Sequence, residues 1–297
     1  MKTVAITGAL GNLGWKFVQH MSAHADVRRV IGLDLHVPSS EQLGELSAVQ
    51  TGKCEFVSSD LLDWQDRRWR DAVDRSDAVV HFAAQNPFPE ASWDDANRSL
   101  DMTLNVALAS VDVGVGRFVF VSSNHVMGRY KNSPLADTIG TGELTTSLEH
   151  AVGTVWQVGE REMDSTPYAV AKSSGERLCQ ALGTRADGRT TFVSVRVGWC
   201  QPGENEPATL SAAGTPTQAI GIERDADFER ADLWFRHMWL SNRDFAQLFE
   251  RAVLAKADTW PEPSVVVNGV SGNTGMAWSL DEAQRYLGYA PQDDVEA

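Results

Sequence analysis

Short apolar segments alternate with amphipathic stretches through the first two-thirds of the chain. The apolar segments are nearly continuous rather than alternating, which is typical of strands buried on both faces of a parallel sheet. Near the C-terminus a further short apolar segment follows the same pattern. We therefore expect strands at Val4–Thr7, Arg29–Leu33, Glu55–Ser58, Ala78–Phe82, Arg117–Ser122, Thr191–Val197 and Ser264–Val267.

The stretches between these segments carry apolar residues at helical spacing. Strands that alternate with helices require crossover connections, so the pattern predicts a doubly wound α/β fold with a parallel sheet. A tryptophan-rich stretch, Leu233–Leu240, follows residue 230. The expected helices are Leu13–His24, Asp66–Val73, Thr103–Val113, Tyr168–Leu182, Arg243–Lys256 and Leu280–Leu287.

Two stretches break this alternation, at about residues 131–166 and 201–230. Both are rich in Gly, Thr, Glu and Pro, and we expect them to be irregular. Long irregular segments within a compact domain commonly form lids or binding loops.

Composition excludes several classes of function. The 297 residues carry a net charge of −14, which disfavours binding to nucleic acid. No apolar run approaches the roughly 18 residues that span a bilayer, so no membrane segment is expected. The three cysteines, Cys54, Cys179 and Cys200, are widely spaced. They predict reduced, buried thiols in a cytoplasmic protein, without a disulfide framework or a metal site.

A glycine-rich turn follows the first expected strand, with Gly8, Gly11 and Gly14 at GxxGxxG spacing. Glycines allow a tight turn and close approach to a pyrophosphate, which the N-terminus of the next helix attracts. Asp34 follows 20 residues after Gly14, where a carboxylate can accept both ribose hydroxyls. Neither residue 35 nor residue 36 is Arg or Lys, which favours NAD over NADP.

These features predict a Rossmann-like NAD-binding domain over residues 1–200, with an insertion at about 131–166. Residues 201–297 are expected to form a small substrate-binding region interleaved with it. The expected cofactor contacts are Gly8, Gly11, Asn12, Leu13, Gly14, Asp34, Leu35, Asp60, Leu61, Phe82, Ala83, Ala84, Tyr168 and Lys172.

Tyr168 and Lys172 are four residues apart in YAVAK, so a helix would place both on one face. Oxidation of an alcohol needs a base, and an ordinary tyrosine with a pKa near ~10 is too weak. A lysine cation and a positive nicotinamide would favour the phenolate and could bring its pKa to about 7. An exposed Tyr–Lys pair without function is the alternative.

Ser122 and Ser123 end the fifth expected strand, at the sheet edge where ligands of such folds bind. A serine hydroxyl there could hold the reacting oxygen. Asn124 and His125 follow and could bond neighbouring hydroxyls. His125 could equally be a structural histidine with satisfied hydrogen bonds.

With these residues in hand, the chain resembles the extended short-chain dehydrogenase/reductase (NAD-dependent epimerase/dehydratase) superfamily. It resembles most closely the uronate dehydrogenases and related NAD-dependent sugar dehydrogenases. The resemblance implies oxidation of the C1 hydroxyl of an aldose or hexuronate to a lactone. It also implies a catalytic set of Ser123, Tyr168 and Lys172, and sugar contacts from Asn86, Ser123, Asn124 and His125. The motifs that carry it are TGALGNLG, HFAA, VSSNH, YAVAK, VRVGWC, MWLSNRDF and SLDEAQRYLGYAPQDD.

Three features depart from the uronate enzymes. Trp199 stands where they have a small residue, and Trp234 where they have a carboxylate-binding arginine. The segment between SSNH and the tyrosine is about twenty residues longer. We therefore expect the substrate to be a neutral aldose, with Trp199 stacking on the sugar, or an anionic sugar held by Arg236, Arg230 or Arg129. Alternatively, both tryptophans are core residues and Arg236 replaces the missing arginine.

Two other functions remain open from the sequence: an NAD-retaining epimerase or dehydratase of nucleotide sugars, and a non-catalytic NAD-binding regulator. The sugar, its anomer and the oligomeric state are also open, a homo-oligomer included.

Overall fold

The computed structural model describes residues 1–85, 91–158, 160–186, 188–211 and 223–297. One seven-stranded sheet runs through the molecule in the order β3-β2-β1-β4-β5-β8-β9, and every neighbouring pair is parallel. This confirms the doubly wound α/β prediction. The strands are β1 (Lys2–Thr7), β2 (Val27–Asp34), β3 (Cys54–Ser58), β4 (Ala78–His81), β5 (Arg117–Ser123), β8 (Thr191–Val197) and β9 (Ser264–Gly269).

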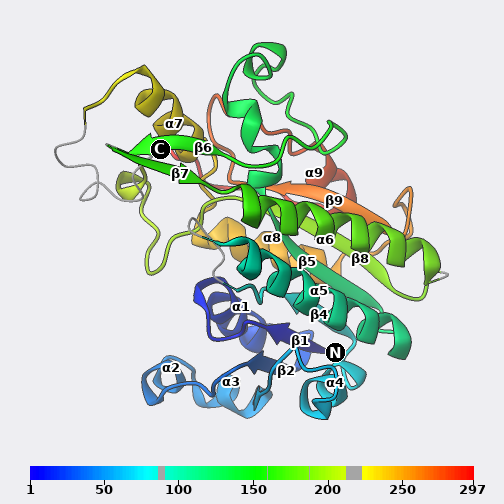
Figure 1. The fold of residues 1–297 in the computed structure, drawn as a ribbon. Coiled ribbons are helices and arrows are strands. Elements are labelled where there is room, and N and C mark those ends of the chain that lie inside the picture. Colours follow the sequence, from blue (N-terminus) through cyan, green and yellow to red (C-terminus); the bar gives the residue numbers. More distant parts are fainter. Residues whose placement is uncertain (86–90, 159, 187, 212–222) are drawn as a thin grey trace.

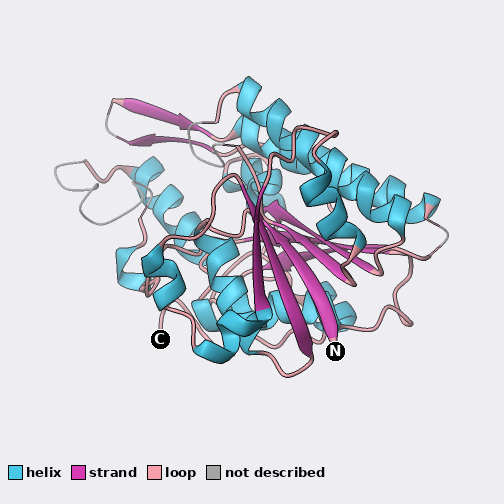
Figure 2. Ribbon diagram, turned by 90° about the horizontal axis from the view of Figure 1, so that it is seen from below, coloured by secondary structure: helices cyan, strands magenta, loops and turns pink. Residues whose placement is uncertain are grey.

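Helices cover both faces of the sheet (Figures 1 and 2). Val4 and Ile6 of β1 belong to the apolar cluster on one face, whereas Ala5 belongs to the cluster on the other. This alternation is expected of a strand buried on both sides. Helices α1 (Asn12–Ala23), α8 (Asn242–Leu254) and α9 (Asp281–Leu287) contribute to the first cluster, and α4 (Arg67–Asp74), α5 (Trp93–Val113) and α6 (Thr166–Arg185) to the second.

The predicted strands all form, but the helix predicted at Thr103–Val113 begins ten residues earlier, at Trp93. Its first half is rich in Asp, Asn, Arg and Ser, so it lacks the apolar spacing on which the prediction relied. The structure shows another signal there: Ser92 and Asp95 form a capping box at the helix start. Short helices α2 (Ser40–Gly44) and α3 (Ala48–Lys53) were also not predicted.

The prediction that residues 131–166 and 201–230 are irregular is partly wrong. The first stretch contains an antiparallel hairpin, β6 (Val155–Val158) and β7 (Arg161–Asp164). The second ends inside α7 (Ala226–His237), which continues into the tryptophan-rich stretch. Both fold because they share an apolar cluster, with Trp156 of β6 packed edge-on against Phe235 of α7 at 4.8 Å between ring centroids.

The apolar cluster that contains Trp156 and Phe235 is the third in the molecule. It forms a lobe that continues from the carboxyl ends of three strands. The 3₁₀ segment η1 (Asn124–Lys131) follows β5, the Trp199 backbone pairs with Trp239 after β8, and Val270 follows β9. Two shorter 3₁₀ turns are η2 (Ala136–Thr138) and η3 (Pro207–Thr209). The C-terminal part of the chain therefore contributes to the lobe and, through β9, to the main sheet.

The cysteines are free thiols: Cys179 and Cys200 are buried as predicted, whereas Cys54 is half-buried. None of the helices in the described ranges is long and apolar enough to cross a membrane.

Candidate active site

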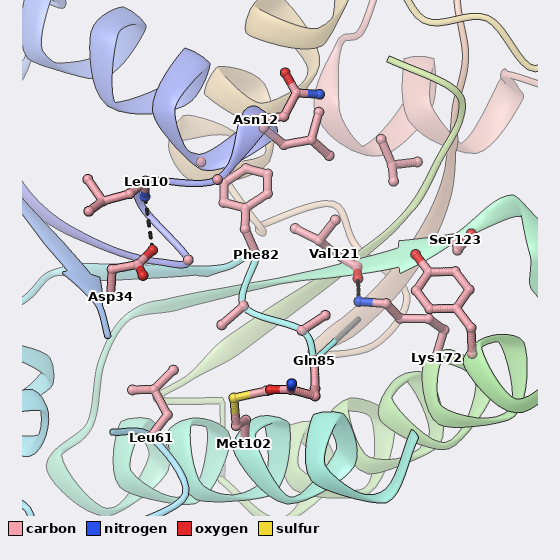
Figure 3. Close-up of a pocket in the computed structure, with 18 of the residues that line it drawn as sticks. Leu10, Asn12, Asp34, Leu61, Phe82, Gln85, Met102, Val121, Ser123 and Lys172 are labelled. Carbon is pink, nitrogen blue, oxygen red and sulfur yellow. Dashed lines mark hydrogen bonds between the residues drawn. The ribbon is translucent and has the colours of Figure 1, made fainter. Parts of the chain in front are cut away.

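A cavity of about 830 Å³ lies along the carboxyl edge of the sheet (Figure 3). Its wall comes from the ends of β2, β4, β5 and β8 and from α7. Asn124 and Arg236 do not line it, and Asn86 lies outside the described residues. The predicted residues that do line it are Gly8, Gly11, Asn12, Leu13, Gly14, Asp34, Leu35, Asp60, Leu61, Phe82, Ala83, Ala84, Ser123, His125, Tyr168, Lys172 and Trp199.

The glycine turn leaves the start of α1 open to the cavity. Gly8 has a φ of +63°, and a Cβ there would lie 2.8 Å from the Ala83 backbone nitrogen. A Cβ on Gly14 would lie 2.0 Å from the Gly8 carbonyl oxygen. No side chain caps α1 at Gly11, whereas serine or aspartate side chains cap α4, α5, α7 and α8. The free N–H groups and the positive end of the α1 dipole therefore suit a pyrophosphate.

Asp34, the last residue of β2, is held beside this turn. Its Oδ2 accepts a hydrogen bond from the Leu10 backbone N–H at 3.0 Å, and Oδ1 accepts one from the Leu35 N–H at 2.8 Å. A carboxylate has further lone pairs, so both oxygens can still accept hydroxyl groups from the cavity. The next lining residues are Leu35 and His36, which provide no permanent positive charge for a 2′-phosphate.

Ser123, Tyr168 and Lys172 meet at the other end of the cavity. Ser123 is the last residue of β5, and the other two lie in the first turns of α6. The Tyr168 side chain forms a hydrogen bond with Ser123. The Lys172 Nζ donates to the Val121 carbonyl oxygen at 2.7 Å and lies 5.6 Å from the centroid of the Tyr168 ring. The predicted i, i+4 pair therefore faces the strand end that carries the serine.

The pKa of Tyr168 in the protein without cofactor is set mainly by burial. Burial raises the pKa of Tyr168 to about 12, and the Ser123 hydrogen bond only partly opposes this. Lys172 is itself buried, which lowers its pKa to about 8. In the protein by itself, desolvation of the phenolate therefore outweighs the Ser123 hydrogen bond.

His125 has the hydrogen bonds of a structural histidine and also lines the cavity. Its Nδ1 lies 2.8 Å from the Thr154 Oγ1 and 3.0 Å from the Ser165 Oγ, which fixes the ring. The ring also lines the cavity, 6.1 Å from the Tyr168 ring between centroids. Burial lowers the pKa of His125 to about 3, so the imidazole is neutral near pH 7. Asn124 beside it is fully buried and does not reach the cavity wall.

Aromatic side chains close the cavity beyond Tyr168. Trp199 and Phe235 pack edge-on with 5.4 Å between their centroids, and both line the cavity together with Met238. The sequence analysis missed Phe235 and Met238. Their signal was the i, i+3 apolar spacing within the tryptophan-rich stretch, which places them on one face of α7.

The arginines considered as anion ligands all lie outside this cavity. Arg236 donates to Glu296 at 3.1 Å, Arg230 pairs with Asp227, and the Arg129 Nε donates to the Val152 carbonyl at 3.0 Å. The Arg236 side chain thus meets the C-terminal segment and not the cavity wall.

Arg98 is a cation of the cavity wall that the sequence analysis missed. Among the described lining residues, the permanent cations are Arg98 and Lys172. Arg98 lies on α5 one turn before Met102, and Met102 shares an apolar cluster with Leu61. Ser99, next to Arg98, bonds the Gln85 backbone after β4, whereas Asn105, further along α5, bonds the Leu61 carbonyl in the loop after β3.

Residues 4–198 match the profile of the NAD dependent epimerase/dehydratase family, well over half of the chain. The chain belongs to this family. It is 31% identical to an NAD-dependent glucose-6-phosphate dehydrogenase of Haloferax volcanii, a match that covers 98% of this chain and 93% of the relative. It is also 29% identical to an L-arabinose 1-dehydrogenase (NAD(P)(+)) of the same organism, over 99% of this chain and 98% of the relative.

A solved structure of a mutated uronate dehydrogenase has a TM-score of 0.67 to this chain and 26% sequence identity. The match covers 100% of this chain and 84% of that one. The relatives and the solved structure are thus dehydrogenases named for a sugar, a sugar phosphate and a uronate. Their names do not agree on whether the substrate carries a charge.

In this member of the epimerase/dehydratase family, a buried ionic group supports α6 from behind. Glu176 accepts hydrogen bonds from Ser122 at 2.5 Å and from the Arg196 Nε at 3.0 Å. The Nε2 of His150 lies 3.2 Å from the other Glu176 oxygen. These bonds, with Arg196 the main charge partner, hold the Glu176 pKa at about 2 despite burial. The group ties α6 to β5 and β8 directly behind Ser123.

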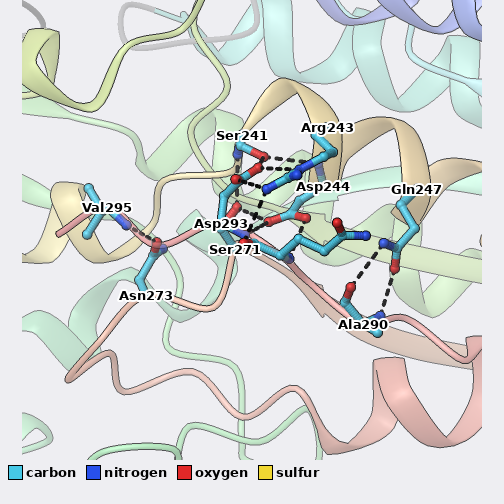
Figure 4. Close-up of polar contacts among 10 residues, drawn as sticks. Ser241, Arg243, Asp244, Gln247, Ser271, Asn273, Ala290, Asp293 and Val295 are labelled. Carbon is cyan, nitrogen blue, oxygen red and sulfur yellow. Dashed lines mark hydrogen bonds and ion pairs between the residues drawn. The ribbon is translucent and has the colours of Figure 1, made fainter. Parts of the chain in front are cut away.

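The MWLSNRDF and GYAPQDD motifs meet in a polar cluster that anchors the C-terminal segment (Figure 4). Asp244, in the first turn of α8, accepts the backbone N–H groups of Gln292 and Asp293 and the hydroxyl of Ser271. Asp293 in turn pairs with Arg243. These residues hold the C-terminal segment against α8 and do not line the cavity, so their role in this family member is structural.

Proposed function

We propose that this protein is an NAD-dependent dehydrogenase that oxidises the C1 hydroxyl of an aldose. One observation carries the proposal: Ser123, Tyr168 and Lys172 share a single cavity with an uncapped helix start and a ribose-type carboxylate, Asp34. A cofactor with a pyrophosphate and a ribose diol fits the first end, and an alcohol fits the second.

The oxidation of C1 requires a hydride acceptor, a base and a hydrogen bond to the reacting oxygen. When bound, NAD supplies the acceptor for the hydride that leaves C1. Tyr168 takes the hydroxyl proton, and Ser123 holds the reacting oxygen while the carbonyl forms. Lys172 keeps a positive charge beside the phenol and is fixed by Val121. A ring aldose carries its ring oxygen on C1, so loss of a hydride and a proton produces a lactone.

The cofactor end favours NAD over NADP. The Asp34 carboxylate would repel a 2′-phosphate. Arg98 lines the cavity from α5, and we assign it to a phosphate of the dinucleotide rather than to the sugar.

The sugar end favours an uncharged substrate. Trp199 and Phe235 offer apolar faces against which the C–H face of a pyranose can pack, whereas Arg236, Arg230 and Arg129 are all committed elsewhere. The undescribed residues contain no Lys or Arg in the sequence. A buried carboxylate without a cation is strongly disfavoured, which argues against a hexuronate.

The test is to add free NAD and a panel of sugars to the purified protein and follow absorbance at the NADH band. A dehydrogenase accumulates NADH in step with lactone. An NAD-retaining epimerase would convert nucleotide sugars without releasing NADH, and a regulator would do neither. The proposal would be contradicted if none of the sugars in the panel led to NADH formation, or if only nucleotide sugars were converted.

A further inference from the structure

A second cavity, of about 390 Å³, is lined by a different face of α7 from the one that lines the active site. Phe235 and Met238 of α7 line the first cavity, whereas Trp234 and His237 line the second. The two walls have no residue in common. The second cavity is therefore separate from the catalytic residues, and nothing in the proposed reaction uses it.

Lys131, the last residue of η1, lines this second cavity and is only 2% exposed. Its ammonium has no hydrogen-bond partner among the described residues. The carboxylate Oδ1 of Asp227 lies 3.6 Å away, too far for a hydrogen bond, and it already accepts one from Arg230. The ion pair with Asp227 therefore leaves the three N–H donors of this buried ammonium without a hydrogen-bond acceptor, which is costly unless something supplies one.

The indole N–H groups of two tryptophans in the same wall also lack hydrogen-bond acceptors within the described residues. Trp234 and Trp278 pack together with 4.5 Å between their ring centroids. Both indole N–H groups are buried, and within the described ranges neither has a hydrogen-bond partner. Three buried donor groups of one wall are thus unsatisfied, which is unusual because buried polar groups are nearly always paired.

Charges of both signs lie near this wall. Lys131 and Arg230 line the cavity, and Asp227 is the carboxylate that pairs with both. His237, at the wall's other side, lies near Glu296 and Asp294. Two permanent cations therefore face one shared carboxylate, in a chain whose net charge is −14.

We propose that this second cavity binds a small oxyanion, a phosphate or carboxylate group, with Lys131 as its main ligand. An oxyanion supplies several acceptor lone pairs and a negative charge, which meets the needs of the ammonium and of the indole donors. Ile139, Leu233 and the indole rings would cover the apolar part of a larger ligand.

The test titrates inorganic phosphate, and separately acetate, into the protein by calorimetry. Indole ¹H–¹⁵N signals are followed in parallel and assigned with Trp234→Phe and Trp278→Phe. We expect one of the anions to bind and shift both indole signals. Lys131→Met should weaken this binding by about tenfold or more, the size of one lost charge-assisted hydrogen bond. The exposed Lys256→Met is the matched control and should bind as wild type does.

Arg230→Gln provides a second variant if Lys131→Met does not fold, and it should weaken binding to a smaller degree because this arginine is half exposed. Equal anion affinity in wild type and both variants, or neither anion moving the two indole signals, would overturn the proposal. Neither readout uses catalytic activity, so the result is independent of the proposed function.

Discussion

The nucleotide end of the cavity is built from strand ends and backbone, whereas its sugar end is built from side chains of distant segments. At the nucleotide end, Gly8, Asp34 and Ala83 each lie within two residues of a strand terminus. At the sugar end, Trp199 and Phe235 come from different segments and meet through the lobe's packing.

This difference indicates that the substrate preference can change while the cofactor site stays the same. The glycine turn needs its exact residues, because a Cβ on Gly14 would collide with the Gly8 carbonyl. The aromatic wall depends on how α7 packs, so a few substitutions there can alter the substrate while the cofactor site stays intact. The relatives fit this: they share a dehydrogenase description but are named for different sugars.

The largest expected effect separates chemistry from cofactor binding. Tyr168→Phe removes the proton acceptor but keeps the ring, so kcat should fall by about 10²-fold or more. The Kd for NAD, measured by fluorescence, should stay nearly unchanged. Tyr286→Phe, on α9 and away from the cavity, is the control and should keep full activity. Near-normal turnover of Tyr168→Phe would mean that Tyr168 is not the catalytic base.

A smaller effect is expected from the nucleotide end. Asp34→Arg removes the acceptor for the ribose hydroxyls and adds a cation, so kcat/KM for NAD should fall by about tenfold or more. Relative use of NADP should rise, and the KM for the sugar should change little if the two ends are independent. Asp258→Arg, at an exposed position, controls for the charge change. A wild-type preference for NADP would show that Asp34 has been misassigned.

The smallest expected effect is a shift in pH dependence. Oxidation needs deprotonated Tyr168, so kcat should rise with pH through the pKa of that phenol in the complex. Lys172→Met removes the nearby positive charge, which raises this pKa and moves the rise to higher pH by about one unit or more. Lys172→Arg keeps the charge and should restore part of the shift. An unchanged profile in Lys172→Met would mean that the ammonium does not act on the phenol.

Much of the nucleotide end could be predicted from sequence because its signals are local. Gly8, Gly11, Gly14 and Asp34 sit at fixed distances from one strand–turn–helix unit, and all line the cavity. The strands themselves were predictable because both faces are buried, which leaves continuous apolar runs.

The sugar end could not be predicted because its residues are brought together by long-range packing. Arg236 resembles a ligand in the sequence, yet its side chain meets Glu296, sixty residues away. Trp234 lies one residue from Phe235 but faces the other cavity, which only the helical geometry of α7 decides. Glu176 belongs to no motif, and its pairing with Arg196 of VRVGWC appears only when α6 packs on β8.

The claim that the substrate is an uncharged aldose is tested most directly by comparing kcat/KM for neutral and anionic sugars with NAD. Glucose and galactose are measured against glucuronate, galacturonate and glucose 6-phosphate, for wild type, Arg236→Ala and Arg98→Gln. We predict that a neutral aldose is used at least as well as any anionic sugar. We also predict that Arg98→Gln raises the KM for NAD without changing the order of the sugars. A strong preference for an anionic sugar that collapses in either arginine variant would contradict the account.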